Sequence, residues 1–231
     1  MFSITLSNEK CKIKLTSAKD GAPLGSVTGV KIKRRELGDT SWTVIYTQAI
    51  TSVDDFNYTF LDKYTRSRRT YEYKVIPMIG STEETAVNTS IECNFDELYI
   101  TDFATEYSLF LNADFDYDGH GSSVVQELMN SRTPIIIENA MSDYITGYVD
   151  AIPLPLDANG NPISIGAQKY KEQFISFLKN KKNKYIKTNE GEAWLVYIHE
   201  PPKRNKAEAE GAASIKFSFT EIGDSPTHDE G

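Results

Sequence analysis

Alternating carboxylates near the middle of the chain are the side chains best placed to do chemistry. The set comprises Asp114, Asp116 and Asp118. With Gly119 they match the first half of the D-x-D-x-D-G loop that binds calcium. That loop needs a bidentate carboxylate at its twelfth position, but here the position is Val125, and Glu127 comes two residues later. We interpret the segment as a solvated acidic turn and predict no metal site, with weak calcium binding by the Asp114–Asp118 loop as the alternative.

The other residues that carry catalysis in many proteins form no motif here. His120, His199 and His228 are scattered, and no G-x-S-x-G elbow, H-E-x-x-H helix or P-loop occurs. Cys11 and Cys93 are too few for a disulfide framework and lack metal-ligand spacing. We expect two buried reduced thiols, with a bond between them as the alternative. We predict that the protein is not an enzyme and has no catalytic, cofactor-binding or metal-binding residue.

A cluster of lysines follows a predicted helix. It comprises Lys179, Lys181, Lys182 and Lys184. Cations at a helix C-terminus complement the negative end of the helix dipole, and we favour this interpretation because it needs nothing beyond the helix. A contact with an acidic neighbouring copy is the functional alternative. Nucleic-acid binding is a third interpretation, which the net charge of −8 disfavours.

Aromatic side chains in the second half suggest a further role. Tyr144, Tyr148, Trp194 and Tyr197 stand in strand-like runs and could line a sugar-binding face. Their alternation with polar residues is more typical of half-buried strands that pack on a helix. We therefore favour a structural role for them.

The composition bounds the class of protein. The chain has 231 residues, of which 39% are hydrophobic and 25% charged, as in ordinary soluble proteins of one large or two smaller domains. Its first residues lack the cationic start and apolar run of an export signal, and no apolar run is long enough to span a membrane. We expect a protein without a membrane span that is made in a cytoplasm.

Residues 1–94 carry the pattern of a β-sandwich. Short runs of strand-forming residues alternate with turn residues, at a spacing typical of two packed sheets. The runs cover residues 11–17, 29–37, 41–48, 56–62, 71–79 and 85–95. In one of them Tyr71, Tyr73 and Val75 share a face, while the residues between them face water.

This segment resembles a fibronectin type III module, in which a tyrosine opens the sixth strand in a Y-x-Y/F-x-V pattern and a glycine turn follows. The matching residues are Tyr71, Tyr73, Val75 and Gly80. The early tryptophan expected in the second strand is not evident, and Trp42 falls later. The resemblance implies a fibronectin-like sandwich, and a sandwich of another type is the alternative.

Residues 95–223 mix strands and helices, which favours an α+β module. We predict strands at 97–103 and 106–112, the acidic turn at 113–123, a helix at 123–131, strands at 134–139 and 143–154 around a turn, and a hairpin turn at 157–162. A second helix is predicted from the helical spacing of Tyr170, Phe174, Phe177 and Leu178. Residues 201–214 read as an exposed loop, and residues 224–231 as a mobile C-terminal tail.

A shift of fifty residues exposes a weak repeat within this module. The aligned pairs are Leu128 with Leu178, Asn130 with Asn180, Ile136 with Ile186, Asn139 with Asn189, and Tyr144 with Trp194. The repeat predicts two helix-plus-hairpin units whose helices close over one sheet.

The second unit resembles a family of bacteriophage tail proteins, with a helix that ends in FLTNGKPK, a hairpin xLKDWNGNxWLV and a last strand that ends in EIGD. The matching residues are Phe177, Leu178, Asn180, Lys182, Lys184, Asn189, Gly191, Trp194, Leu195, Val196, Phe217, Phe219, Glu221, Ile222 and Gly223. An upstream block matches through Pro134, Asn139, Tyr144 and Gly147. The chain departs from the pattern at Asn183, where the family often has proline, and at Glu190.

This resemblance implies a structural component of the virion at the tail tip or baseplate, similar to distal tail proteins, assembled in the host cytoplasm. It implies a ring or collar of identical copies, as a trimer or hexamer, between the tail tube and the adhesion apparatus. The implied partners are other tail proteins, namely the tube, the tip or hub and the tape measure, and not nucleic acid. A carbohydrate-binding accessory protein that recognises the host surface is the alternative function.

Overall fold

A computed structural model describes residues 2–19, 25–109, 111–126, 135–157, 161–163, 166–205 and 213–223. The chain groups into two compact units. Unit 1 contains Met1–Glu97 and Lys187–Ala193, and unit 2 contains Leu98–Ile186 and Trp194–Asp224. The described residues are mainly β-strand, in antiparallel sheets. The expected domain boundary at 94/95 stays a prediction. The expected tail at 224–231 lies outside the described residues.

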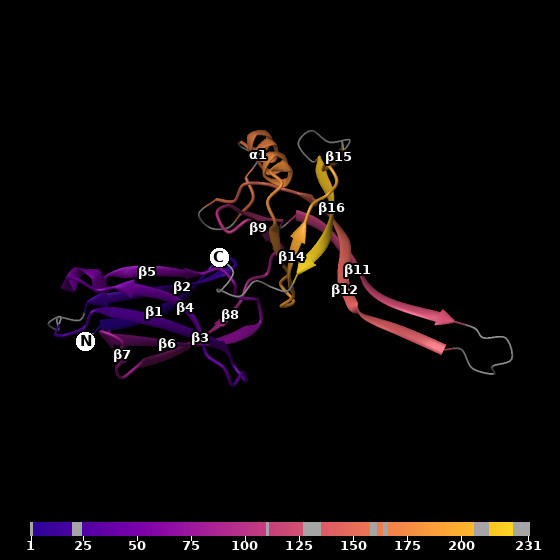
Figure 1. The fold of residues 1–231 in the computed structure, drawn as a ribbon. Helices are drawn as coiled ribbons and strands as arrows, with labels where there is room; N and C mark the ends of the chain where they lie inside the picture. Colours follow the sequence, from indigo (N-terminus) through magenta and orange to yellow (C-terminus); the bar gives the residue numbers. More distant parts are fainter. Residues whose placement is uncertain are drawn as a thin grey trace. The chain divides into compact units, whose positions relative to one another are not determined.

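Unit 1 consists of two antiparallel sheets (Figure 1). One has the order β1 (Phe2–Glu9), β2 (Lys12–Lys19) and β5 (Tyr58–Asp62). The other has the order β4 (Thr43–Ala49), β3 (Gly29–Glu36), β6 (Arg69–Ile79) and β7 (Thr82–Glu83), with β8 (Val87–Cys93) also paired to β6. The six predicted strands are all present. The sequence interpretation missed β1, an edge strand whose Ile4 and Leu6 are only half-buried.

The buried carboxylate of Asp62 links the two sheets of unit 1. Nη1 of Arg34 on β3 donates to both of its oxygens, at 2.7 and 2.9 Å, and Oη of Tyr73 on β6 donates to Oδ2 at 2.8 Å. These bonds satisfy a charge that burial would otherwise make costly. The backbone N–H of Arg66 donates to Oη of Tyr71 at 2.9 Å, the tyrosine-corner contact of many sandwiches. This arrangement suits a β-sandwich.

The segment Lys187–Ala193 comes from the second half of the sequence and belongs to unit 1. The side chain of Lys187 is buried, and its Nζ donates to the carbonyl oxygens of Cys11, at 2.8 Å, and Lys63, at 2.6 Å. Gly191 has a φ of 94°, and a Cβ on it would lie 2.8 Å from the carbonyl oxygen of Ser67. The turn at Gly191 therefore has a packing role that requires glycine.

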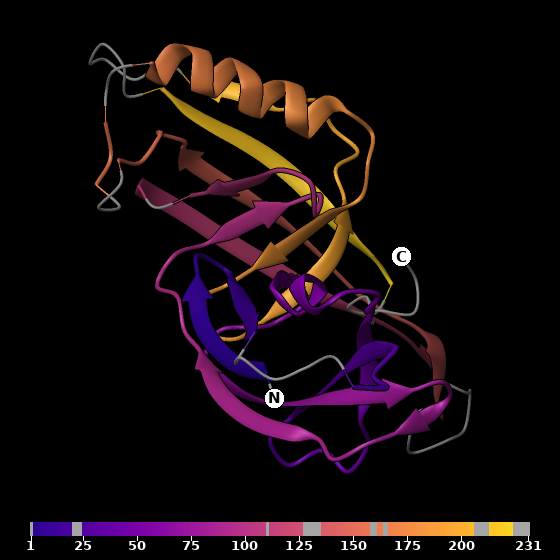
Figure 2. The ribbon, with the colours of Figure 1, turned by 90° about the vertical axis from the view of Figure 1, so that its left-hand side faces the viewer.

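Unit 2 is one large antiparallel sheet with a helix on one face. The strand order is β10 (Glu106–Ser108), β9 (Tyr99–Thr101), β13 (Lys184–Lys187), β14 (Ala193–Tyr197), β16 (Ser214–Gly223), β12 (Ile135–Ile152) and β11 (Leu111–Gln126), and β15 (Lys203–Asn205) also pairs with β16. The helix α1 (Ala167–Lys179) lies along β16 (Figure 2). Its Phe174, Phe177 and Leu178 pack into the sheet's core, as the helical spacing predicts.

The acidic turn and the helix predicted at 113–131 are wrong for the described residues. Residues 111–126 form the strand β11 without interruption. The capping-box pattern at Ser123 and Gln126 was misleading because both residues pair with β12. Residues 127–131 lie outside the described residues.

The turn predicted between the strands at 134–139 and 143–154 is also wrong. Both predicted strands belong to β12, and the residues between Asn139 and Asp143 are an irregularity in its pairing with β11. Pairing with a partner strand on both sides of this point keeps the backbone extended. The predicted turn at 157–162 is confirmed, since the backbone N–H of Asp157 donates to the carbonyl oxygen of Asn161 at 2.8 Å.

The predicted pair of helix-plus-hairpin units is not present in the described residues. The second unit has its helix α1 and its hairpin β13–β14. The first unit has one continuous strand, β12, where the repeat expected a hairpin. The predicted loop at 201–214 contains the short strand β15, which pairs with β16.

Candidate functional site

The most distinctive feature of unit 2 is an arm that the long hairpin β11–β12 forms beyond the body of the sheet (Figure 1). Strand β12 pairs with β16 only from Thr146 to Ala151. Its pairing with β11 continues outward as far as Gln126 opposite Ile135. Residues before Thr146 therefore belong to a two-stranded ribbon, which we call the arm. Such a ribbon has two open edges and little capacity to form a core of its own.

The three aspartates of the calcium-like motif lie at the base of this arm, on the face of the sheet opposite α1. Side chains alternate along a strand, and Phe115 packs against the core on the α1 side. The aspartates on either side of it therefore point outward, and all three are exposed. With Asp150 on β12 they define what we call the acidic face, formed by Asp114, Asp116, Asp118 and Asp150.

Tyrosines, a histidine and a lysine accompany these carboxylates on the acidic face. Oη of Tyr148 donates to Oδ2 of Asp114 at 3.0 Å, and this bond raises the pKa of Tyr148. Nζ of Lys216 lies 3.7 Å from the centroid of the Tyr148 ring. Nε2 of His120 lies 2.6 Å from Oγ1 of Thr146, and its ring stacks on Tyr144. The acidic face thus combines carboxylates with the rings of Tyr148, Tyr144 and His120.

The geometry does not favour a calcium loop. Alternate residues of an extended strand stand about 6.8 Å apart, so carboxylates on such positions do not converge as they do around the sharp turn of a calcium loop. Among the residues that the structure describes, no group of three His, Cys, Asp or Glu side chains could hold a metal ion. His199 lies near Thr220, away from any nucleophile motif, and His228 lies outside the described residues.

The predicted lysine cluster divides into exposed and buried members. Lys179 is in the last turn of α1, and Lys181 and Lys182 follow the helix; all three are exposed. We call these three the helix-end lysines. Lys181 has a φ of 60°, the left-handed conformation in which a chain commonly leaves a helix. The helix dipole accounts for the position of Lys179, but not for the lysines beyond the helix.

Lys184, in contrast, is buried beneath the helix end. Its Nζ donates to Oδ1 of Asn180 at 2.6 Å and to the carbonyl oxygen of Lys182 at 2.7 Å, and it lies 4.6 Å from the centroid of the Phe177 ring. Burial lowers the pKa of Lys184 to about 8; Asp102 opposes this shift and Lys182 adds to it. This lysine therefore closes the end of α1 rather than offering a surface charge.

The aromatic residues proposed for sugar binding have different environments. Trp194 is half-buried and stacks on Phe115 with ring centroids 5.8 Å apart. Tyr144 is exposed on the arm, whereas Tyr148 and Tyr197 are half-buried. No single face gathers all four, because Trp194 packs on the core side and Tyr148 lies on the acidic face. Binding of sugars to any of them stays a prediction.

The two cysteines are buried free thiols in unit 1. Sγ of Cys93 donates to Oγ1 of Thr65 at 3.5 Å, and burial raises the pKa of Cys93. A raised thiol pKa suits a structural residue rather than a nucleophile.

The arm is the functional element that the sequence interpretation missed. Its signal was present in the unbroken run of strand-forming residues at 144–152 and in the apolar residues Val124 and Val125. Glycines and aspartates in 114–121 concealed it, because these residues favour turns. No helix of the described residues is long and apolar enough to cross a membrane.

Comparisons with known proteins give weak structural likenesses. No protein-family model matches the chain, and no curated protein matches it. Among solved structures, a chain from the virion of a native gene transfer agent particle aligns over 55% of this chain and 92% of its own length, with 11% identity and a TM-score of 0.33. A structure of titin kinase and its flanking domains aligns over 95% of this chain and 37% of its own length, with 12% identity and a TM-score of 0.30. At these scores neither likeness identifies a function.

Proposed function

We propose that this protein is a non-enzymatic structural component of a bacteriophage tail tip or baseplate, and that its copies assemble into a ring or collar between the tail tube and the adhesion apparatus. The arm carries the proposal of assembly. The resemblance of Phe177–Val196 and Phe217–Gly223 to tail proteins carries the proposal of the location.

The arm is a structure that a single copy does not complete. Beyond Thr146 its two strands have no third strand beside them in the described part of the chain. Isolated two-stranded ribbons are marginally stable in water, and open strand edges pair readily with other chains. A segment of this length is therefore expected to be stabilised by another subunit.

The residue types in the outer part of the arm support a contact that excludes water. The register places Val124 opposite Ile137 and Val125 opposite Ile136. Apolar residue types at paired positions of a two-stranded ribbon favour its association with another chain.

The fibronectin type III identity of unit 1 is part of the same proposal. The tyrosine-corner contact of Tyr71 and the two linked sheets support it. In this proposal unit 1 is carried by each copy of the ring, and the neighbouring partners are the tube, the tip or hub and the tape measure. The assembly is a trimer or hexamer that joins the virion tail in the host cytoplasm.

Removal of the arm tests the assembly directly. His120 and Tyr144 are opposite each other, so residues 121–143 can be replaced by Asn-Gly, which favours a two-residue hairpin turn. We expect the full chain to form a closed oligomer in native mass spectrometry and the shortened chain to be monomeric, with an unchanged unfolding transition. A full chain that stays monomeric at high concentration would contradict the proposal.

The location in the virion needs a separate measurement. Purified tails from cells that produce the phage particle should contain this chain at a fixed ratio to the tube protein, measured by quantitative mass spectrometry. Absence of the chain from intact tails would exclude the structural role even if the isolated protein oligomerises.

A further inference from the structure

We propose that the helix-end lysines of one copy dock on the acidic face of a second copy. This inference rests on the proposed function and deepens it, because it names the two surfaces through which identical copies join. The first surface is formed by Lys179, Lys181 and Lys182, and the second by Asp114, Asp116, Asp118 and Asp150.

The acidic face is a side of the sheet that no element of unit 2 covers among the described residues. The helix α1 packs on the other side, where Phe174 contacts Phe217. Three exposed carboxylates, those of Asp114, Asp116 and Asp118, project from this side, with the half-buried Asp150 beside them; register places Lys216 opposite Asp150. Asp114, Asp116 and Asp118 form no ion pair with a described residue of the chain; the polar contacts of Asp114 and Asp116 are with the Tyr148 hydroxyl and the Tyr117 N–H.

The helix-end lysines are similarly open. All three are exposed, and none forms an ion pair within the described ranges. The carboxylate of Asp102 accepts hydrogen bonds from the backbone N–H groups of Ala104 and Thr105, and against the effect of burial these bonds, together with Lys184 and Lys182, lower its pKa. Three ammonium groups on a short stretch therefore present a compact positive surface.

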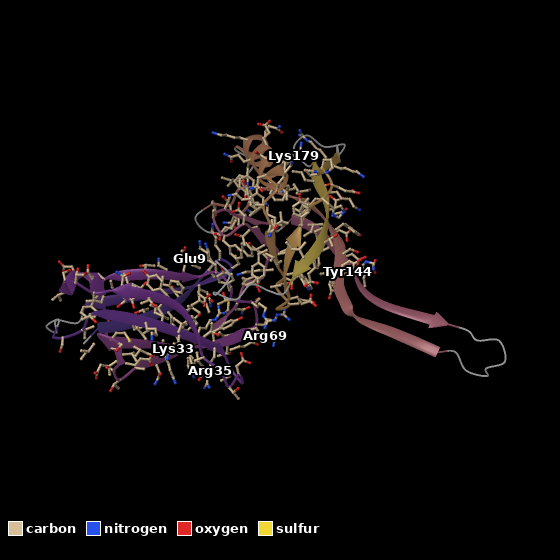
Figure 3. All side chains as sticks on the ribbon, in the orientation of Figure 1. Glu9, Lys33, Arg35, Arg69, Tyr144 and Lys179 are labelled. Atoms are coloured by element: carbon tan, nitrogen blue, oxygen red, sulfur yellow. The ribbon has the colours of Figure 1, made fainter. Side chains whose placement is uncertain are left out.

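The two surfaces are unable to meet within one copy. The sheet lies between them, since α1 is on its core side and the acidic face is on the opposite side. Figure 3 shows Lys179 at the helix and Tyr144, a neighbour of the acidic face, where the arm leaves the sheet. Two different, complementary surfaces on opposite sides of one unit join copies head to tail, and such a contact forms a ring when its rotation closes.

The charges determine how two copies are oriented in this contact, and they supply only a small part of the free energy of association. Exposed ion pairs contribute about 0.2–1 kcal/mol each and are screened by salt. Opposed like charges cost more than matched charges gain, so the contact selects the correct orientation between copies. The acidic face would repel a nucleic acid, whereas it attracts the lysines of a second copy.

Charge reversal on each surface tests the inference. The variant D116K/D118K removes the net negative charge of the four aspartates, and K181E/K182E reverses the charge of the helix end. Each alone places like charges in contact, and we expect the dissociation constant between copies to rise at least tenfold at about 0.1 M salt, as measured by sedimentation equilibrium. An equimolar mixture restores complementary contacts at every junction of a hexamer and at two of the three junctions of a trimer, so we expect mixed oligomers whose composition native mass spectrometry can count.

The matched control is K10E/K169E, which makes the same change in net charge as K181E/K182E on two exposed lysines outside both surfaces. It should assemble as the wild-type chain does. Circular dichroism and urea unfolding of each variant exclude misfolding, and recovery in the mixture excludes it independently.

The outcomes separate this inference from the proposed function. If the wild-type chain oligomerises but both reversed variants assemble equally well, or if the mixture stays monomeric, the inference is wrong and assembly uses other surfaces. If the wild-type chain is itself monomeric, the proposed function fails. Retention of a duplex oligonucleotide by the wild-type chain, abolished in K181E/K182E, would assign the lysines to nucleic acid and overturn the inference.

Discussion

Nζ of Lys184 lies 2.6 Å from Oδ1 of Asn180, so a buried ammonium closes the C-terminal end of α1. The bond holds the residue that ends the helix. It also places a titratable group where burial disfavours its charge. The lysine cluster of the sequence thus contains one residue whose role is internal stability and three whose charges face outward.

The pH dependence of stability should report Lys184. Its pKa is about 8 in the folded chain, below its ordinary value of 10.5. The unfolded chain therefore binds more protons between these values, so this group makes the free energy of unfolding rise with pH across that window, and its contribution becomes constant below about pH 8. In K184M this rise should disappear, and the stability of the variant relative to wild type should fall by about 1–2 kcal/mol between pH 7 and 9.5.

Urea unfolding at several pH values checks this expectation. K169M, which removes an exposed lysine at the other end of α1, is the matched control and should give a curve parallel to wild type. Parallel curves for K184M and wild type would show that Lys184 titrates as an ordinary lysine.

Gly147 should be intolerant of a side chain. A Cβ on it would lie 2.4 Å from the carbonyl oxygen of Asp116 and 2.7 Å from a ring carbon of Phe219. The strand backbone and a buried ring have little room to move, so G147A should lower the free energy of unfolding by about 1–3 kcal/mol. Gly119 has nothing within 4 Å of the equivalent position, so G119A should change stability by less than about 0.5 kcal/mol. Equal effects of the two substitutions in urea unfolding would contradict this account.

We expect loss of Arg34 to destabilise the fold more than loss of the Tyr73 hydroxyl does. Both groups bind the buried carboxylate of Asp62, but only Arg34 carries a positive charge. Loss of the guanidinium in R34M leaves a buried carboxylate without its cation, at a cost of about 3–5 kcal/mol. Y73F removes one hydrogen bond to that carboxylate, at a cost of about 1–3 kcal/mol. R34M should therefore have a lower free energy of unfolding than Y73F, as thermal and urea unfolding can measure. The reverse order would mean that Tyr73 holds the two sheets together more strongly than the ion pair does.

Lys181 should show opposite effects on stability and assembly. Its φ of 60° suits glycine better than lysine. K181G should raise the free energy of unfolding by about 0.5–1 kcal/mol and weaken association between copies, because it relieves the backbone and removes one helix-end charge. K181N, which also tolerates this conformation and lacks the charge, should weaken association in the same way. Stronger association of K181G would contradict the docking of the helix-end lysines.

Local sequence patterns predicted the parts of this fold that local physics decides. The alternation of Tyr71, Tyr73 and Val75 gives β6 one buried face, and the spacing of Phe174, Phe177 and Leu178 gives α1 its core side. In both cases the period of the apolar residues matches one type of element. The strand formers of residues 11–95 and the turn at 157–162 were predicted on the same basis.

The errors lie where a partner strand overrode local preference. The aspartates and glycines of 114–121 favour a turn by themselves, yet they pair with β12 over their whole length. The apparent turn between Asn139 and Asp143 and the capping pattern at Ser123 were lost to the same pairing. Long-range hydrogen bonds of this kind are not encoded by residue spacing within one segment.

The sequence by itself determined that this chain is mainly β, that its helix buries an aromatic face, and that its acidic balance disfavours a polynucleotide partner. Only the tertiary structure decided that the aspartates form an open face, that Lys184 is internal while its neighbours are exposed, and that Lys187 belongs to unit 1. The reason is physical: burial periodicity is a property of one segment, whereas exposure of a charge depends on which distant segments pack beside it.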